Sequence, residues 1–159
     1  HLGGDSVQVG DASRCSGNNI FIGGGSFHNN RENCIDIKDS SNVVASGFEC
    51  YLPNNKPDEA GVILHDNPVN PQILDGNIYN VNGGIEISGQ DNVVVNGNQV
   101  QANDSGIIVR SADVNISGNS ITAPTCVVNQ GGVSGSVQSG CNELMLYRDY
   151  GLGYRLAVL

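Results

Sequence analysis

The chain of 159 residues is long enough for one domain, but 22 Gly, 5% aromatic residues and no Trp argue against a thick core of large side chains. A formal net charge of −9 with only 7 Lys and Arg argues against nucleic-acid binding, because neutralising phosphates requires clustered cations. No apolar run approaches the roughly 20 residues of a membrane-spanning helix, so neither nucleic acid nor a membrane is expected as a partner.

Short stretches of alternating apolar residues recur from the start of the chain. Each member of a first set opens with a small residue, which is followed by an apolar, a variable and an apolar position. This alternation predicts β-strands with one buried face, and it argues against disorder, which needs no alternation. The members are residues 6–9, 34–37, 61–64, 84–87, 106–109 and 126–129.

A second set of strands is predicted between the members of the first. Three of its members continue into Gly-Asn steps, which predict a ladder of Asn77, Asn98 and Asn119 at a bend with left-handed backbone geometry. A third apolar position follows each of these steps. The members are residues 19–22, 42–45, 72–75, 92–95, 113–116 and, more weakly, 136–139.

The spacing of the repeat predicts the fold. Successive first inward residues are separated by 28, 27, 23, 22 and 20 residues, and self-similarity at such periods is typical of repeat architectures. We therefore predict an all-β protein, a right-handed single-stranded parallel β-helix of about six coils over residues 1–142, with an irregular C-terminal cap over residues 143–159. Coils should stack at about 4.8 Å, so that equivalent positions form ladders. The first inward residues are Val7, Ile35, Val62, Ile85, Ile107 and Val127.

Polar and ionisable side chains gather on one outer face of the predicted solenoid. Lys38, His65, Ser88 and Arg110 should form one outward column, with Glu86 beside Ser88. Lys38 and Arg110 would be three coils apart, roughly 14 Å, which fits a polymer groove better than a compact triad. A solvated face that carries charge without function is an equally open alternative.

Three carboxylates are predicted to lie close together near the start of the repeat. Asp5 precedes the first strand, Glu32 precedes the second, and Asp36 points outward within the second. Carboxylates on neighbouring coils repel one another unless a cation joins them, and calcium takes oxygen ligands of this kind. A calcium site is one hypothesis, and the alternative is that these residues simply cap strand ends.

Two further pairs of residues leave alternatives open. Neighbours on a strand point to opposite faces, so a hydrogen bond between His65 and Asp66 is expected only if the strand ends at His65. Cys126 and Cys141 could form a local disulfide, or they could be buried as small apolar residues.

Three stretches resemble pectate-lyase-type right-handed β-helix proteins: GDSVQ at 4–8, NRENCIDIK at 30–38 and NVV at 42–44. The likeness is closest to lyases whose calcium cluster uses Asp residues from successive coils. By this resemblance Asp5, Glu32 and Asp36 occupy acidic positions of the cluster, and Asn33 replaces a further Asp. The resemblance covers residues 3–48 in motif detail and the rest of the chain only in repeat style.

The resemblance also implies a chemistry. In that family a Lys or Arg on the coil after the metal cluster removes the proton α to the uronate carboxylate, and the cation acidifies that proton. The matching position here is Ile63, which cannot act as a base. Lys38 and His65 flank it and are the expected substitutes, with Arg110 holding a carboxylate through two hydrogen bonds.

Two functions are therefore predicted. The first is a secreted, extracellular or periplasmic lyase that acts on acidic, uronate-containing polysaccharide by calcium-assisted β-elimination, with Lys38, His65 and Arg110 catalytic and Glu86 and Ser88 binding substrate. The second is a non-catalytic β-helix that binds carbohydrate or builds a surface protein or phage fibre. The acidic cluster and the cationic column favour the first, whereas the missing base and the scarcity of aromatic residues favour the second.

Overall fold

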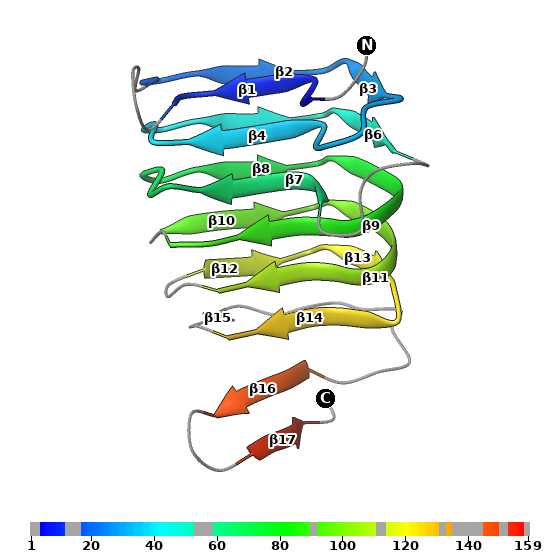
Figure 1. Ribbon diagram of the computed structural model, residues 1–159. Coiled ribbons are helices and arrows are strands. Elements are labelled where there is room, and N and C mark those ends of the chain that lie inside the picture. The colour runs from blue at the N-terminus through cyan, green and yellow to red at the C-terminus, as the bar shows by residue number, and fades with distance from the viewer. Residues whose placement is uncertain are drawn as a thin grey trace.

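The computed structural model describes residues 4–11, 17–52, 59–89, 92–110, 114–130, 133–134, 145–149 and 153–157. Within these residues the regular structure is β-strand, and none of it is a helix of the length and apolarity that a membrane span requires. Each coil pairs in parallel with the next, so the chain winds into the stacked solenoid seen in Figure 1. The predicted all-β parallel β-helix is confirmed.

The first face of the solenoid carries the strands expected from the first repeat set. Their register aligns Val7, Ile35, Val62, Ile85 and Ile107, as the spacing predicts, and Val127 follows in the next strand. The strands, in stacking order, are β1 (Val7–Val9), β4 (Ile35–Lys38), β7 (Ala60–His65), β9 (Asn77–Ile87), β11 (Gln99–Val109) and β14 (Thr125–Asn129).

The second face is a separate parallel sheet that corresponds to the second repeat set. Its last member begins at Val133, and the weaker prediction at 136–139 lies outside the described residues. The strands are β2 (Phe21–Gly23), β5 (Val44–Ser46), β8 (Gln72–Leu74), β10 (Val93–Asn96), β12 (Val114–Ser117) and β15 (Val133–Ser134).

A third face completes each turn. It consists of β3 (Ser26–His28), β6 (Glu49–Tyr51), the first residues of β9 and of β11, and β13 (Ser120–Thr122). Because β9 and β11 continue around the bend, the third face and the first face form one hydrogen-bonded sheet. The last coil, begun by β14, continues only into the two-residue β15 within the described part of the chain. Complete turns are therefore slightly fewer than the six coils expected.

The C-terminal tail contains strands where an irregular cap was expected. β16 (Met145–Asp149) pairs in parallel with β14, and β17 (Gly153–Ala157) pairs antiparallel with β16. The first sheet is thus extended by two strands, and the last pair reverses direction. The predicted boundary at residues 142 and 143 lies outside the described residues.

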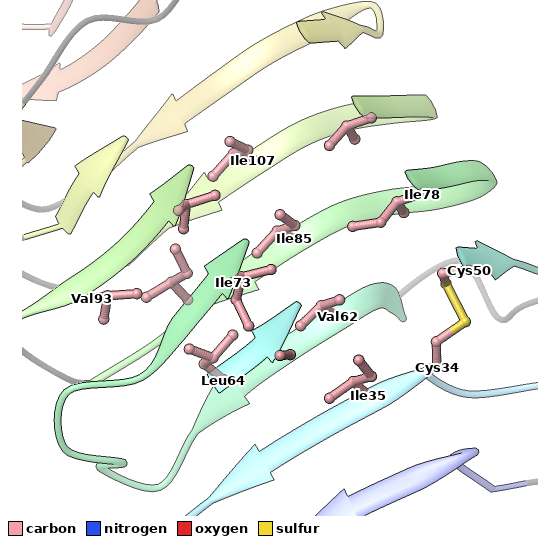
Figure 2. Packing of buried hydrophobic residues seen from close by; sticks show 14 of the residues in the cluster. Cys34, Ile35, Cys50, Val62, Leu64, Ile73, Ile78, Ile85, Val93 and Ile107 are labelled. Atoms are coloured by element: carbon pink, nitrogen blue, oxygen red, sulfur yellow. A yellow bond between two sulfur atoms is a disulfide. The ribbon is translucent and has the colours of Figure 1, made fainter. Parts of the chain in front are cut away.

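The core is a narrow tube of aliphatic side chains. Ile35, Val62, Ile85 and Ile107 are fully or almost fully buried and stack on one another from coil to coil, as Figure 2 shows. Burying each such side chain stabilises the fold by about 1.5–3 kcal/mol. Phe48 is a buried aromatic residue of this core, which is otherwise filled mainly by smaller aliphatic side chains, in keeping with a composition without Trp.

A glycine stands where the third face turns into the first, opposite a branched side chain of the same coil. A Cβ built on Gly84 would lie 2.4 Å from Val100 Cγ1, and one on Gly106 would lie 2.2 Å from Ile121 Cγ2. These separations are far shorter than carbon–carbon contact distances. In these coils the glycine that opens the strand of the first set is therefore required by packing.

A disulfide takes the same place in one coil. Cys34 occupies the small-residue position before β4, Cys50 points inward from β6, and the two are bonded to each other across the tube (Figure 2). This pair was not predicted from the sequence. Cys126 is also disulfide-bonded, and Cys141, the partner suggested for it, lies outside the described residues.

The predicted ladder of Asn77, Asn98 and Asn119 is wrong at its first member. Asn77 is in register with Gln99, so the neighbour of Asn98 in the preceding coil is Gly76. In the coil before Asn98, the left-handed residue of the bend is Asp75 instead of a glycine. The Gly76-Asn77 step of that coil therefore comes one position later than the Gly97-Asn98 step of the next. The left-handed residues are Asp75, Gly97 and Gly118, with φ of 51°, 70° and 62°.

Asn98 and Asn119 are fully buried and join successive bends by hydrogen bonds. The Oδ1 atom of Asn98 accepts from the Gly76 amide at 2.8 Å, and its Nδ2 atom donates to the Ile73 carbonyl at 2.9 Å. Asn119 repeats the arrangement one coil later, accepting from the Asn98 amide at 2.9 Å. Each side chain therefore satisfies backbone groups that the bend removes from strand pairing.

Asn98→Ala should lower the free energy of unfolding by about 2–4 kcal/mol, because it leaves a buried amide and a buried carbonyl without partners. Urea unfolding measures the change. Asn115→Ala, on the exposed side of β12, is the matched control and should change stability by no more than about 0.5 kcal/mol. Equal losses in both variants would contradict a structural role for the buried ladder.

Candidate functional site

The outward column on the first face is formed as predicted. Lys38 is in register with His65, the amide of Ser88 donates to the carbonyl before His65, and the amide of Arg110 donates to the carbonyl before Ser88. Ser88 therefore lies between His65 and Arg110. Glu86 lies two residues before Ser88 in the chain, in register with Ile63 of the preceding coil. The placement is confirmed, and the roles of these residues stay predictions.

A buried carboxylate joins two neighbouring coils of the column. Asp36 exposes only 3% of its side chain, and its two oxygens contact different side chains. Its Oδ2 atom lies 2.8 Å from Lys38 Nζ on the same strand, and its Oδ1 atom lies 3.0 Å from His65 Nε2 on the next. Lys38 and His65 remain partly exposed, at 23% and 30% of their side chains. Two partly exposed ionisable groups thus share one buried anion.

His65 also contacts its sequence neighbour. The Nδ1 atom of His65 lies 3.1 Å from Asp66 Oδ2. The contact forms because β7 ends at His65 and the chain turns there, with left-handed φ of 55° at Asp66 and 57° at Asn67. This was the one condition under which the sequence allowed such a pair. Because a neutral imidazole donates from only one nitrogen, two simultaneous hydrogen bonds require the imidazolium form.

Burial dominates the electrostatics of Asp36. It raises the pKa of the Asp36 carboxyl above its ordinary value, and the hydrogen bond from Lys38 and the charge of His65 offset this only in part. The hydrogen bond to Asp36 in turn raises the pKa of Lys38, which stays protonated at neutral pH. An ion pair that does not recover its own desolvation does not stabilise the fold, and strained electrostatics of this kind are typical of functional sites.

A second ion pair lies further along the face. Arg110 Nε donates to Glu86 Oε1 at 2.8 Å, and its Nη1 atom contacts Gln130 Oε1 at 3.5 Å. Almost half of the Arg110 side chain is exposed, so water screens this pair and it adds little stability. Arg110 and His65 are two coils apart, about 10 Å. The predicted cationic residues therefore form two ion-paired groups rather than one cluster.

The three carboxylates expected to bind calcium are each engaged elsewhere. Asp5 Oδ1 accepts from the backbone and side-chain nitrogens of Asn33, at 3.0 and 2.9 Å, and the two oxygens of Asp36 contact Lys38 and His65. Glu32 is half-buried and has an interaction of its own. In the part of the chain that the structure describes, no group of three His, Cys, Asp or Glu side chains could hold a metal ion. Calcium binding stays a prediction that this arrangement does not support.

Asn33, which the resemblance places at an acidic position, has a structural role. Its side chain donates to Asp5 in the preceding coil, and its Oδ1 atom accepts from the Ala60 amide of the following coil at 3.0 Å. An aspartate there could not donate to Asp5 and would place two carboxylates in contact. The amide therefore links three successive coils.

Comparison with known proteins identifies the family of the fold. Residues 3–141 match the family model described as "Right handed beta helix region". No curated protein and no solved structure gives a significant match to the chain. The match covers most of the chain and includes every residue of the two ion-paired groups.

The stability of the protein should show the cost of the buried Asp36 charge. The pKa of this carboxyl is raised on folding, so above its ordinary value of 3.8 the native state binds more protons than the unfolded state, and stability falls as pH rises. We expect the free energy of unfolding of the wild type to decrease relative to that of Asp36→Asn between about pH 3 and about pH 7. Urea unfolding at each pH measures the difference. A difference that instead grows in favour of the wild type would mean that the ion pairs outweigh burial.

Proposed function

Because the chain belongs to the right-handed β-helix family, we propose that it is a polysaccharide lyase that cleaves acidic, uronate-containing polymers on the outer face of β4, β7, β9 and β11. The observation that carries the proposal is the group formed by Lys38, His65 and the buried Asp36. It combines an orienting anion, a protonated cation and a titratable base on adjacent coils, where an extended polymer can reach them.

The base in this proposal is His65. When its Nε2–H donates to Asp36 Oδ1, the lone pair of the neutral imidazole is on Nδ1, and the buried carboxylate fixes the orientation of the ring. The imidazole takes the proton from the carbon α to the uronate carboxylate. The electron pair of that C–H bond forms a double bond to the neighbouring carbon, and the glycosidic oxygen leaves and is protonated.

Lys38 has the complementary role. Its raised pKa keeps the ammonium charged, so it can receive the uronate carboxylate and stabilise the negative charge that develops as the α proton is removed. The substrate carboxylate would compete with Asp36 for Nζ. Asp66, half exposed on its turn, would give up Nδ1 of His65 to the substrate.

Arg110, Glu86 and Ser88 would bind the polymer next to the reacting sugar. Arg110 is about two coils from His65, and its exposed guanidinium can exchange Glu86 for a uronate carboxylate in a two-hydrogen-bond geometry. Ser88 lies between the two groups and offers a hydroxyl. The direction of the polymer would then follow the stacking axis of the coils.

The compartment is part of the same proposal. The Cys34–Cys50 disulfide supports an oxidising environment, because such bonds persist mainly in secreted, extracellular and periplasmic proteins. A polymeric substrate outside the cell is consistent with that location. The reaction proposed above does not require calcium, because protein side chains supply both the base and the cation.

A second function is favoured by one observation. Lys38, His65 and Arg110 all have carboxylate partners already, so a uronate must displace an existing ion pair to bind. A face whose charges are mutually satisfied is also what a non-catalytic carbohydrate-binding or structural β-helix would present. The two functions differ in whether polymer is cleaved.

The ultraviolet absorbance of an unsaturated uronate product decides between them. Pectate, alginate and a glycosaminoglycan are each incubated with the protein, with and without a chelator. We expect product on at least one polymer, and His65→Ala should lower kcat by about 10²-fold or more because it removes the base. Lys38→Ala should also lower kcat, and Asn115→Ala on the second face is the matched control.

Absence of product on all three polymers would refute the lyase proposal. Retained binding of a polymer without cleavage would then favour the non-catalytic function. A chelator that abolishes activity would show that a metal ion takes part, and an unchanged rate in His65→Ala would remove that residue from the reaction.

A further inference from the structure

The third face carries two outward columns that the first-face chemistry does not use. Their residues alternate with inward-facing ones along β3, β6, β9, β11 and β13, and parallel register aligns them from coil to coil. One column consists of Ser26, Glu49, Asn77, Gln99 and Ser120. The other consists of His28, Tyr51, Tyr79, Gln101 and Thr122.

The middle of this face is hollowed into a cleft of about 410 Å³. The volume lies within the range of small-ligand sites, about 300–1,000 Å³. The wall is mostly polar and spans four successive coils, about 14 Å from the first to the last. The side chains that matter for recognition are those of Glu49, Asn77, Tyr79, Gln99, Gln101 and Thr122.

Tyr79 and Glu49 lie at one end of the cleft, and Tyr51, outside its lining, packs against Tyr79. Tyr51 and Tyr79 stack with their ring centroids 5.0 Å apart and their planes inclined by 35°. The Tyr79 hydroxyl donates to Glu49 Oε1, and this hydrogen bond lowers the pKa of Glu49 and raises that of Tyr79. Tyr79 is thereby held by a ring contact on one side and a hydrogen bond on the other.

The remaining wall offers neutral hydrogen-bonding groups. Asn77, Gln99 and Gln101 contribute amides, each able to donate and to accept, and Thr122 contributes a hydroxyl. Among the side chains that line the cleft, the one charged group is the Glu49 carboxylate. An anionic polymer would be repelled there, whereas a ligand rich in hydroxyl groups would find both donors and acceptors. Tyr79 adds an aromatic ring against which an apolar sugar face can pack.

We propose that this cleft is a binding site for a neutral saccharide, separate from the ion-paired groups of the first face. The amides and the threonine hydroxyl hydrogen-bond the sugar hydroxyls, Glu49 accepts from one of them, and Tyr79 packs against the ring. The site thus differs in ligand class from the acidic polymer proposed for the first face.

Isothermal titration calorimetry of the full chain tests this site with neutral oligosaccharides: gluco-, manno-, xylo- and galacto-hexaoses. We expect at least one to bind, and Tyr79→Ala and Gln101→Ala each to weaken that binding by about tenfold or more, since each loses contacts worth about 1.4 kcal/mol. Tyr79→Phe keeps the ring and should lose less. Circular dichroism and thermal unfolding establish that each variant is folded.

Lys38→Ala is the matched control on the first face and should bind the neutral sugar as the wild type does. Conversely, Tyr79→Ala should leave any cleavage of acidic polymer unchanged, so failure of the lyase proposal and failure of this one are distinguishable. Absence of binding for all four probes would overturn the proposal. So would binding that is undiminished in folded Tyr79→Ala and Gln101→Ala, or a preference of the cleft for oligouronates.

Discussion

The structure depends on one constraint, the register in which each coil hydrogen-bonds to the coil before it and the coil after it. In parallel pairing a shift of one residue would move every inward side chain to the outside, so the buried column fixes the alignment of the whole turn. Ile35, Val62 and Ile85 set that alignment for the first face. The outward residues follow from it without further choice, which is why Lys38 and His65, 27 positions apart in the sequence, meet over Asp36.

Packing across the tube adds a second requirement, because each coil must be filled from within itself. The glycines at the bend leave the space that a branched residue of the third face occupies, as Gly84 does for Val100. Within one turn, the small residue thus begins the first-face strand and the large residue lies in the third-face strand that ends the turn. At the other bend, Asn98 and Asn119 replace missing backbone partners with side-chain amides. The Gly- and Asn-rich composition therefore reflects the geometry of the corners.

Sequence reasoning predicted the fold and the outward column well, because both follow from a period-2 pattern and a repeat distance. It missed contacts that occur in one coil and do not repeat along the solenoid. The Cys34–Cys50 bond joins residues from two different faces, and the spacing of 16 residues carries no signal for it. Asp36 was predicted to lie among carboxylates, but its oxygens contact Lys38 on the same strand and His65 on the next. The polar cleft escaped notice because Tyr79 and Gln101 begin long strands that were read only from their later, more regular halves.

The disulfide has a consequence for how such a molecule comes apart. A solenoid is nearly one-dimensional, so its coils can fray in sequence from an open end. The chain between Cys34 and Cys50 contains β4, β5 and β6 and thus passes through all three faces, so the bond closes almost one complete turn into a covalent ring. A ring cannot unwind by rotation of its ends. Unfolding that starts at β1 therefore reaches a turn that is closed by a covalent bond. This turn hinders the propagation of unfolding from that end into the coils that follow.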